Sequence, residues 1–269
     1  MERQHFHELA TDQRESMGLS AGELTNILLA AGNVDTSLEE KDEHKIAIIT
    51  CVNDEVMYQR MVASCQQLDL PAGMELEMLP VRGAVSMCSG YNEGMRTSAA
   101  KYKLYLHQDM LLLRQDILTV MLDHLARHDE VGMIGLAGNR YWCENAIWWE
   151  DPARYMHVIQ RGGSIVGEQR YAVGNMVTDW QPMSMLDGFF LMTQYDIPWR
   201  EELFHGWHFY DISQCVEFRR KGYQIEVPRQ EEPWCIHYCG AKDLDLNYHY
   251  WRQIFLYHYR RDLAEWKKQ

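Results

Sequence analysis

From residue 45 onward, short runs of apolar and β-branched residues alternate with segments of helical periodicity. The run KIAIITCV, which begins at Lys45, predicts a strand, and Val56, Met61 and Cys65 then lie on one face of a predicted helix. MELEMLPV, YKLYLH and VGMIGLA predict further strands, with helical segments between them. Regular alternation of this kind predicts an α/β fold, with a mostly parallel sheet flanked by helices on both faces.

The segments outside this alternation predict the domain organisation. Residues 1–44 predict a helical N-terminal appendage and linker, because SAGE resembles a capping box ahead of LTNILLAAG and a polar run follows. Residues 45–240 form the predicted α/β domain, and residues 241–269 predict a C-terminal helix. Within the domain, the Trp-rich and Gly-rich residues 139–170 predict a long loop over one end of the sheet.

The charge balance limits which ligands the general surface can bind. The 269 residues include 26 Lys and Arg against 39 Asp and Glu, which gives a formal net charge of -13. This charge argues against a nucleic-acid partner and against a general electrostatic attraction to anionic membranes. An anionic ligand would therefore need a local site.

Hydropathy and cysteine usage predict a cytoplasmic location. No run approaches the roughly 20 apolar residues of a membrane-spanning helix, and the start MERQHFHELATDQ has no signal pattern. The seven cysteines are odd in number and lie mostly in apolar stretches, as expected of reduced thiols. The aromatic and basic C-terminal segment leaves three roles open, which are core packing, homodimer contact and peripheral membrane contact.

Polar residues follow several of the predicted strands, at the edge where sheets of this kind bind ligands. Asn53 and Arg82 each follow a strand, and YKLYLH runs directly into His107, Gln108 and Asp109. An Asp at this edge can bind Mg²⁺ or Mn²⁺, and the cation can bridge the phosphates of a nucleotide. A turn with a helix cap is the alternative interpretation.

Two later segments also place carboxylates where chemistry could occur. Asp187 and Gly188 interrupt an apolar strand, which indicates a bulge or the close approach of a ligand. Asp211 follows an aromatic loop at the start of a predicted helix, where it would act as a general base or only as a favourable charge at the helix terminus.

A late Cys-x-His-x-Cys pattern has two interpretations as a metal site. Cys235, His237 and Cys239 form one cluster without a second pair, which is weak support for a structural zinc site. His237 joining Asp109 on one catalytic metal is the alternative. Neither a glycine-rich nucleotide fingerprint nor a serine-hydrolase elbow occurs in the sequence.

In order and spacing, these segments resemble family 2 glycosyltransferases with the GT-A fold. The resemblance rests on IITCVNDE, SGYNEGMRTSAAKYKLYLHQDM, LDGFFLMT, and GWHFYDISQCVEFRRKGYQIEVP followed by IHYCG. It is closest to a subgroup of glycosyltransferase-like domains related to a streptomycin-biosynthesis protein, and it covers roughly residues 45–240.

The resemblance implies a site. It assigns nucleotide-sugar binding to Thr50, Cys51, Asn53, Glu55, Arg82, Asn92, His107, Gln108, Asp187 and Gly188. It assigns acceptor binding to Trp207 and His208, metal binding to Asp109 and His237, and catalysis to Asp211 as the base. Asp109 matches the last Asp of the family's D-x-D metal motif, whereas His107 departs from that motif.

The activity that the resemblance implies is transfer of a sugar from a nucleoside-diphosphate sugar, with a UDP-sugar as the expected donor. The acceptor would be a hydroxyl of a glycan, a glycolipid or a small molecule, with polysaccharide biosynthesis among the compatible pathways. A Mn²⁺ or Mg²⁺ cofactor and an inverting single displacement are implied. A non-catalytic nucleotide-sugar binding module is the alternative, and a nucleotidyltransferase would be expected to have a glycine-rich loop where this chain reads TCVNDE.

Overall fold

The structure is a computed structural model that describes residues 41–162, 165–176, 178–239 and 244–266. The predicted helix of the N-terminal appendage lies outside these residues. The first strand begins at Asp42, three residues before the predicted start at Lys45.

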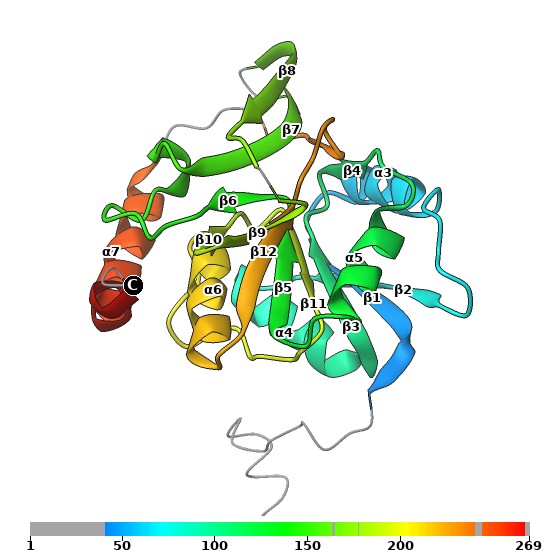
Figure 1. Cartoon of the computed structure of the whole chain (residues 1–269), viewed down its shortest axis with the longest axis horizontal. Coiled ribbons are helices and arrows are strands. Elements are labelled where there is room, and N and C mark those ends of the chain that lie inside the picture. Colours follow the sequence, from blue (N-terminus) through cyan, green and yellow to red (C-terminus); the bar gives the residue numbers. More distant parts are fainter. Residues whose placement is uncertain (1–40, 163–164, 177, 240–243, 267–269) are drawn as a thin grey trace, which may run out of the picture. The chain divides into compact units, whose positions relative to one another are not determined.

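A seven-stranded sheet forms the centre of the described fold (Figure 1). Its strands, in spatial order, are β2 (Glu75–Arg82), β1 (Asp42–Val52), β3 (Ala100–Leu106), β11 (Phe190–Thr193), β5 (Val131–Gly135), β12 (Gln224–Pro228) and β9 (Trp180–Met183). The pairs β1–β2, β1–β3 and β5–β12 are parallel. β11 is antiparallel to both of its neighbours, and β9 is antiparallel to β12. The predicted α/β class is confirmed.

The antiparallel strands of the central sheet come from one segment that lacks helices. β9, β10 (Met185–Leu186) and β11 follow one another with no helix between them. β9 and β11 are antiparallel to β12 and β5, which are parallel to each other, so β9 and β11 both run opposite to the parallel strands. The alternation of strands and helices predicts only the parallel part of the sheet.

Helices cover the sheet because its strands are apolar on both faces. Ile46, Ile48 and Ile49 of β1 are at most 1% exposed. The helices are α3 (Glu55–Cys65), α4 (Met87–Thr97), α5 (Ile117–Leu125) and α6 (Tyr210–Arg220). Asp54 caps α3 by accepting the Met57 N–H. In Figure 1, strands of the sheet lie between α5 and α6.

A second sheet lies beside the first. It contains β10, β6 (Ala137–Asn139), β7 (Arg154–Gly162), β13 (Cys235–His237) and β4 (Met110–Leu112), and β8 (Ile165–Val173) pairs with β7. The prediction of a long loop over residues 139–170 is wrong in part, since these residues include β7 and much of β8, with a 3-10 turn at Trp148–Glu150. The sequence of β7 has little regular alternation, and its strand conformation comes from pairing with β6, β8 and β13.

The C-terminal helix α7 (Leu246–Trp266) packs on the chain's own fold. Its buried residues Tyr248, Trp251, Phe255, Tyr259 and Leu263 recur every three or four positions. α7 contacts α6, so core packing accounts for this face of the helix. No helix among the described residues has both the length and the apolar character needed to cross a membrane.

Candidate active site

The carboxyl ends of β1 and β3 meet at one edge of the central sheet, as predicted for parallel neighbours. Gln108 joins the two strand ends. Its Oε1 accepts the N–H groups of Asn53 and Asp54, each at 2.9 Å, and its amide also contacts the Asn53 side chain. The turn after β3 is closed by the Met110 N–H, which donates to the His107 carbonyl at 3.3 Å. This edge therefore has a fixed backbone.

Asp109 lies between two histidines at this edge. Asp109 Oδ1 is 3.8 Å from His107 Nδ1 and 3.4 Å from His237 Nε2. One ligand atom from each of the three residues lies within 4.8 Å of the others. His237 reaches the cluster because β13 pairs antiparallel with β4, which places His237 opposite Met110.

Burial and mutual charge set the protonation of this cluster. Burial alone would raise the pKa of Asp109, but His237 and His107 outweigh it and hold that pKa well below its usual value. Burial would lower the pKa of His237, whereas Asp109 and Cys239 outweigh it and raise that pKa to about 10. Without a cation, the cluster therefore pairs an imidazolium with a carboxylate. A divalent cation would displace the imidazolium proton on binding.

The cluster fits a divalent cation. Asp109 Oδ1 and His237 Nε2 are buried and 3.4 Å apart, and apart from this ion pair neither atom has a hydrogen-bond partner within the described part of the chain. Buried polar atoms normally have a partner, so both atoms are suited to act as ligands. Two imidazoles and a carboxylate suit a transition metal better than Mg²⁺, which prefers oxygen ligands. The ligands that come together among the described residues are His107, Asp109 and His237, and none is a cysteine. The cluster is therefore not the Cys-x-His-x-Cys zinc site that the sequence left as an alternative.

Two further carboxylates lie in the same cavity. Asp211 Oδ2 accepts the Gly188 N–H at 3.1 Å, and Asp187 Oδ1 accepts the Phe189 N–H at 3.1 Å. Burial, followed by the negative charge of Asp187, raises the pKa of Asp211 to about 7. Burial also raises the pKa of Asp187, although His237 opposes the change. A carboxylate with a pKa near neutrality in a cavity is a candidate general base.

A strained turn leads into α6 and positions its first residues. Phe209 adopts the left-handed conformation, with φ of 64°, which is costly for a residue other than glycine. Its ring is buried against Tyr248 and Phe255 of α7, and this burial offsets the strain. The turn brings the Tyr210 hydroxyl into hydrogen-bond contact with His107 Nε2. Tyr210 thereby orients a candidate metal ligand.

Gly188 is required at its position because of Tyr210. A Cβ atom at residue 188 would lie 2.1 Å from the Tyr210 hydroxyl oxygen, far inside van der Waals contact. The Asp-Gly pair that interrupts the apolar strand therefore allows the Tyr210 side chain to approach the backbone closely. The sequence had left a bulge or the close approach of a ligand as the two interpretations.

Three adjoining cavities surround these groups, with volumes of about 180, 380 and 490 Å³. The strand-end cavity is the smallest and is lined in part by Cys51, Asn53 and Gln108. The central cavity contains Asp211 and the cation-ligand cluster. The hairpin cavity, which is the largest of the three, lies against β7 and β8. Neighbouring cavities share lining residues. The strand-end and central cavities share Asn53, Met87, His107, Asp109 and Trp207. The central and hairpin cavities share Trp148, Trp149, Asp187, His208, His237, Cys239 and Tyr248.

The structure brings most of the predicted site residues together. Those that line these cavities are Cys51, Asn53, His107, Gln108, Asp109, Asp187, Trp207, His208, Asp211 and His237. Gly188 contributes its backbone N–H to Asp211. The remaining predicted residues, Thr50, Glu55, Arg82 and Asn92, are not part of the lining.

Each of these four residues has a different environment. Thr50 is fully buried within β1. Glu55 and Arg82 form an exposed ion pair at 3.0 Å. Asn92 donates to the Trp199 carbonyl at 2.8 Å and accepts the Trp199 N–H at 2.9 Å, so its amide is engaged by the backbone.

Tyr210 and Tyr248 are site residues that the sequence did not reveal. Tyr210 lies beside the predicted Asp211 but had no pattern of its own. Tyr248 belongs to α7, and its ring centroid lies 5.3 Å from that of His208. The sequence pattern of α7 indicates only a helix rich in aromatic residues, with no signal that one of them faces the cavity.

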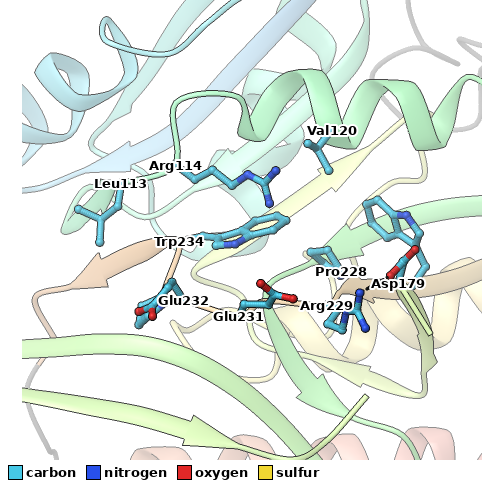
Figure 2. Close-up of a pocket in the computed structure, with 11 residues that line it drawn as sticks. Leu113, Arg114, Val120, Asp179, Pro228, Arg229, Glu231, Glu232 and Trp234 are labelled. Carbon is cyan, nitrogen blue, oxygen red and sulfur yellow. Dashed lines mark ion pairs between the residues drawn. The ribbon is translucent and has the colours of Figure 1, made fainter. Parts of the chain in front are cut away.

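A larger cavity, of about 590 Å³, contains none of the predicted site residues (Figure 2). Arg114 lies over the ring of Trp234, 4.2 Å from its centroid. Figure 2 also shows Arg229 paired with Asp179, at 2.8 Å. The candidate metal-ligand group found among the described residues, Asp109 with its two histidines, contributes no residue to this cavity.

An α/β sheet with a cation-ligand cluster and a carboxylate of raised pKa at its ligand-binding edge fits the GT-A fold that the sequence resemblance implies. A family model described as "Glycosyltransferase like family" matches residues 47–259. The chain therefore belongs to this glycosyltransferase-like family. The match extends beyond residue 240 into α7.

A solved structure of a mannosyltransferase shows the same fold at low sequence identity. A mannosyltransferase from Pyrobaculum calidifontis, solved with GDP-Man and Mn²⁺, is 11% identical, with a TM-score of 0.51 over 84% of this chain and 66% of that one. TarS residues 1–349 from S. aureus are 11% identical, with a TM-score of 0.47 over 72% of this chain and 60% of that one. This chain thus spans less than two thirds of the length of either. No curated protein matches the sequence significantly.

Proposed function

We propose that this protein transfers a glycosyl group from a nucleoside-diphosphate sugar to a hydroxyl acceptor, with inversion at the anomeric carbon. The observation that carries the proposal is that a cation-ligand cluster and a carboxylate with a pKa near 7 line one cavity. Membership of the glycosyltransferase-like family supports it. A UDP-sugar is the donor we propose first, on the basis of the sequence resemblance.

Asp211 is the proposed catalytic base. In a single displacement, the acceptor oxygen attacks the anomeric carbon while Asp211 accepts its proton. A pKa of about 7 allows the carboxylate to be ionised near neutral pH and still to bind a proton effectively. The Gly188 N–H holds one carboxylate oxygen, at 3.1 Å, and fixes the orientation of the other.

Asp109, His237 and His107 would hold a divalent cation, which would neutralise charge on the diphosphate leaving group. Tyr210 orients His107 through its hydroxyl. Gln108 fixes the turn after β1 and so shapes the strand-end cavity, where we place the nucleoside. We propose Trp207 and His208, at the central cavity, as acceptor contacts.

The cellular setting is also a proposal. All seven cysteines are free, which fits a reducing compartment such as the cytoplasm. The acceptor classes that the site allows include glycans, glycolipids and small molecules, and assembly of a polysaccharide is the first pathway we would test.

Transfer from a panel of UDP-, GDP- and TDP-sugars tests this function directly. We expect one donor to release its nucleoside diphosphate in the presence of Mn²⁺, faster when a suitable acceptor is added. NMR of the product should show inverted anomeric configuration, and retention would contradict the single displacement. Tight donor binding without turnover across the acceptor panel would favour the non-catalytic binding module.

A further inference from the structure

The cavity next to the candidate base has an unusual lining. Where the hairpin cavity meets the central cavity, the shared residues include the polar side chains of Asp187, His208 and His237. The rest of its lining is mainly apolar. That part consists of Met156, Tyr171, Val173, Phe189 and Leu244, with Arg154 and Gln160 as its polar members. The cavity thus combines polar and aromatic side chains where it meets the central cavity with a mainly apolar lining beyond them.

The β7–β8 hairpin supplies most of this apolar wall. Side chains alternate along a strand, so Arg154, Met156 and Gln160 lie on one face of β7. Met156 pairs directly with Val173 of β8, and Tyr171 lies on the same face two residues earlier. Figure 1 shows the two strands as a hairpin beyond the strands of the central sheet. A sheet face with this composition and a cavity beside it is suited to an apolar group.

We propose that the hairpin cavity binds an apolar aryl or alkyl group carried by the acceptor. The acceptor would then be an amphipathic molecule, with its reactive hydroxyl in the central cavity and its apolar part against β7 and β8. This inference rests on the proposed glycosyltransferase function. A cavity of about 490 Å³ has room for such a group. Any hydroxyl placed against Met156, Val173 or Phe189 would lack a hydrogen-bond partner there, at a cost in desolvation, whereas an apolar group would not.

The apolar group takes no part in the bond changes. The acceptor oxygen forms a bond to the anomeric carbon, and the bond from that carbon to the diphosphate oxygen breaks. Its electron pair leaves with the nucleoside diphosphate, and the acceptor proton passes to Asp211. Because the hairpin and central cavities adjoin and share lining residues, holding the apolar group would orient the hydroxyl.

Equilibrium binding of matched glycosides tests the inference. We would compare phenyl and methyl glycosides of glucose, galactose and N-acetylglucosamine on the full chain, without donor. At least one phenyl glycoside should bind about tenfold or more tightly than its methyl counterpart. Met156→Gln keeps the side-chain length but adds polarity, and should reduce this preference to less than about threefold. Arg170→Gln, on the outer face of β8 beside Tyr171, should leave the preference unchanged.

The outcomes separate this inference from the proposed function. Equal binding of phenyl and methyl glycosides would overturn the inference. A phenyl preference that survives both Met156→Gln and Tyr171→Gln would also overturn it, because the apolar group would then bind elsewhere. A phenyl preference that Met156→Gln removes, in a protein that transfers from no nucleotide sugar, would support the apolar cavity and contradict the transferase function.

Discussion

Asp211 is an acidic residue whose surroundings oppose its charge. Burial and the nearby Asp187 both raise its pKa, and backbone N–H groups only partly offset them. A protein that used this residue only as a helix cap would gain nothing from a destabilised carboxylate. The arrangement is typical of sites where a base must accept a proton near neutral pH.

Asp211→Asn should lower the transfer rate by about 10²–10⁴-fold, because the amide cannot accept the acceptor proton. Donor binding should change little, since Asp211 is not among the cation ligands. The measurement is kcat and donor Kd for the variant. Asp123→Asn is the matched control, because Asp123 is an exposed carboxylate on α5 that pairs with Arg127, just after the helix ends. Equal activity of the two variants would contradict the role of Asp211.

The rate of transfer should depend on pH through the ionisation of Asp211. The base acts in its ionised form, so kcat should fall about tenfold per pH unit below the pKa of about 7 and level off above it.

The effect of Asp211 ionisation on the stability of the fold has the opposite sign. A raised pKa in the folded protein gives a stability contribution that is present at low pH and is lost as pH rises through about 7. Asp211→Asn should therefore have a higher Tm than the wild type at pH 8, and an equal or lower Tm would contradict the raised pKa.

For single residues, position at the end of a predicted strand indicated a site residue more reliably than residue type did. Asn53 and Asp109 could be predicted because the carboxyl ends of parallel strands share an edge. Asn92 could not be excluded from the sequence, since only packing shows that its amide bonds to the Trp199 backbone. The roles of Tyr210 and Tyr248 depend on a turn and on helix docking, neither of which leaves a local pattern.

Among the elements, α7 does more than cover the fold. Tyr248 packs against Phe209, the residue with left-handed backbone, with ring centroids 4.9 Å apart. It also lines the central cavity. α7 therefore supports the turn that positions Tyr210 and Asp211. Helix periodicity alone predicts only a C-terminal helix and does not reveal this contact with the site.

Tyr248→Leu should reduce kcat about tenfold or more, because a turn that moves by about 1 Å misplaces the base. Tyr257→Leu provides the control, since Tyr257 lies on the same helix and is 64% exposed. Both variants should keep the wild-type circular dichroism spectrum at 25 °C. An unchanged kcat in folded Tyr248→Leu would show that α7 does not support the site.

Elements were predicted best where helices separate the strands. β1, β3 and β5 follow this rule, and their apolar runs identify them. β7 and β8 do not, because their neighbours in the sheet, more than their own composition, determine their structure.

For the whole molecule, charge and cavities together indicate how an anionic donor would bind. A formal net charge of -13 opposes the approach of a diphosphate. A divalent cation on Asp109 and its two histidines would reverse the local field at the point where the strand-end and central cavities meet. Donor binding should therefore require the cation.

Thermal unfolding with UDP, GDP and TDP, each with and without Mn²⁺, tests this central claim most directly. A ligand present at about 100 times its Kd adds about 2.7 kcal/mol to the free energy of unfolding. For a protein of this size that corresponds to a rise in Tm of roughly 5 °C or more. We predict this rise for one nucleotide with Mn²⁺ only, and its loss in Asp109→Ala. No rise with any nucleotide in the folded wild type, or an equal rise in Asp109→Ala, would contradict the account.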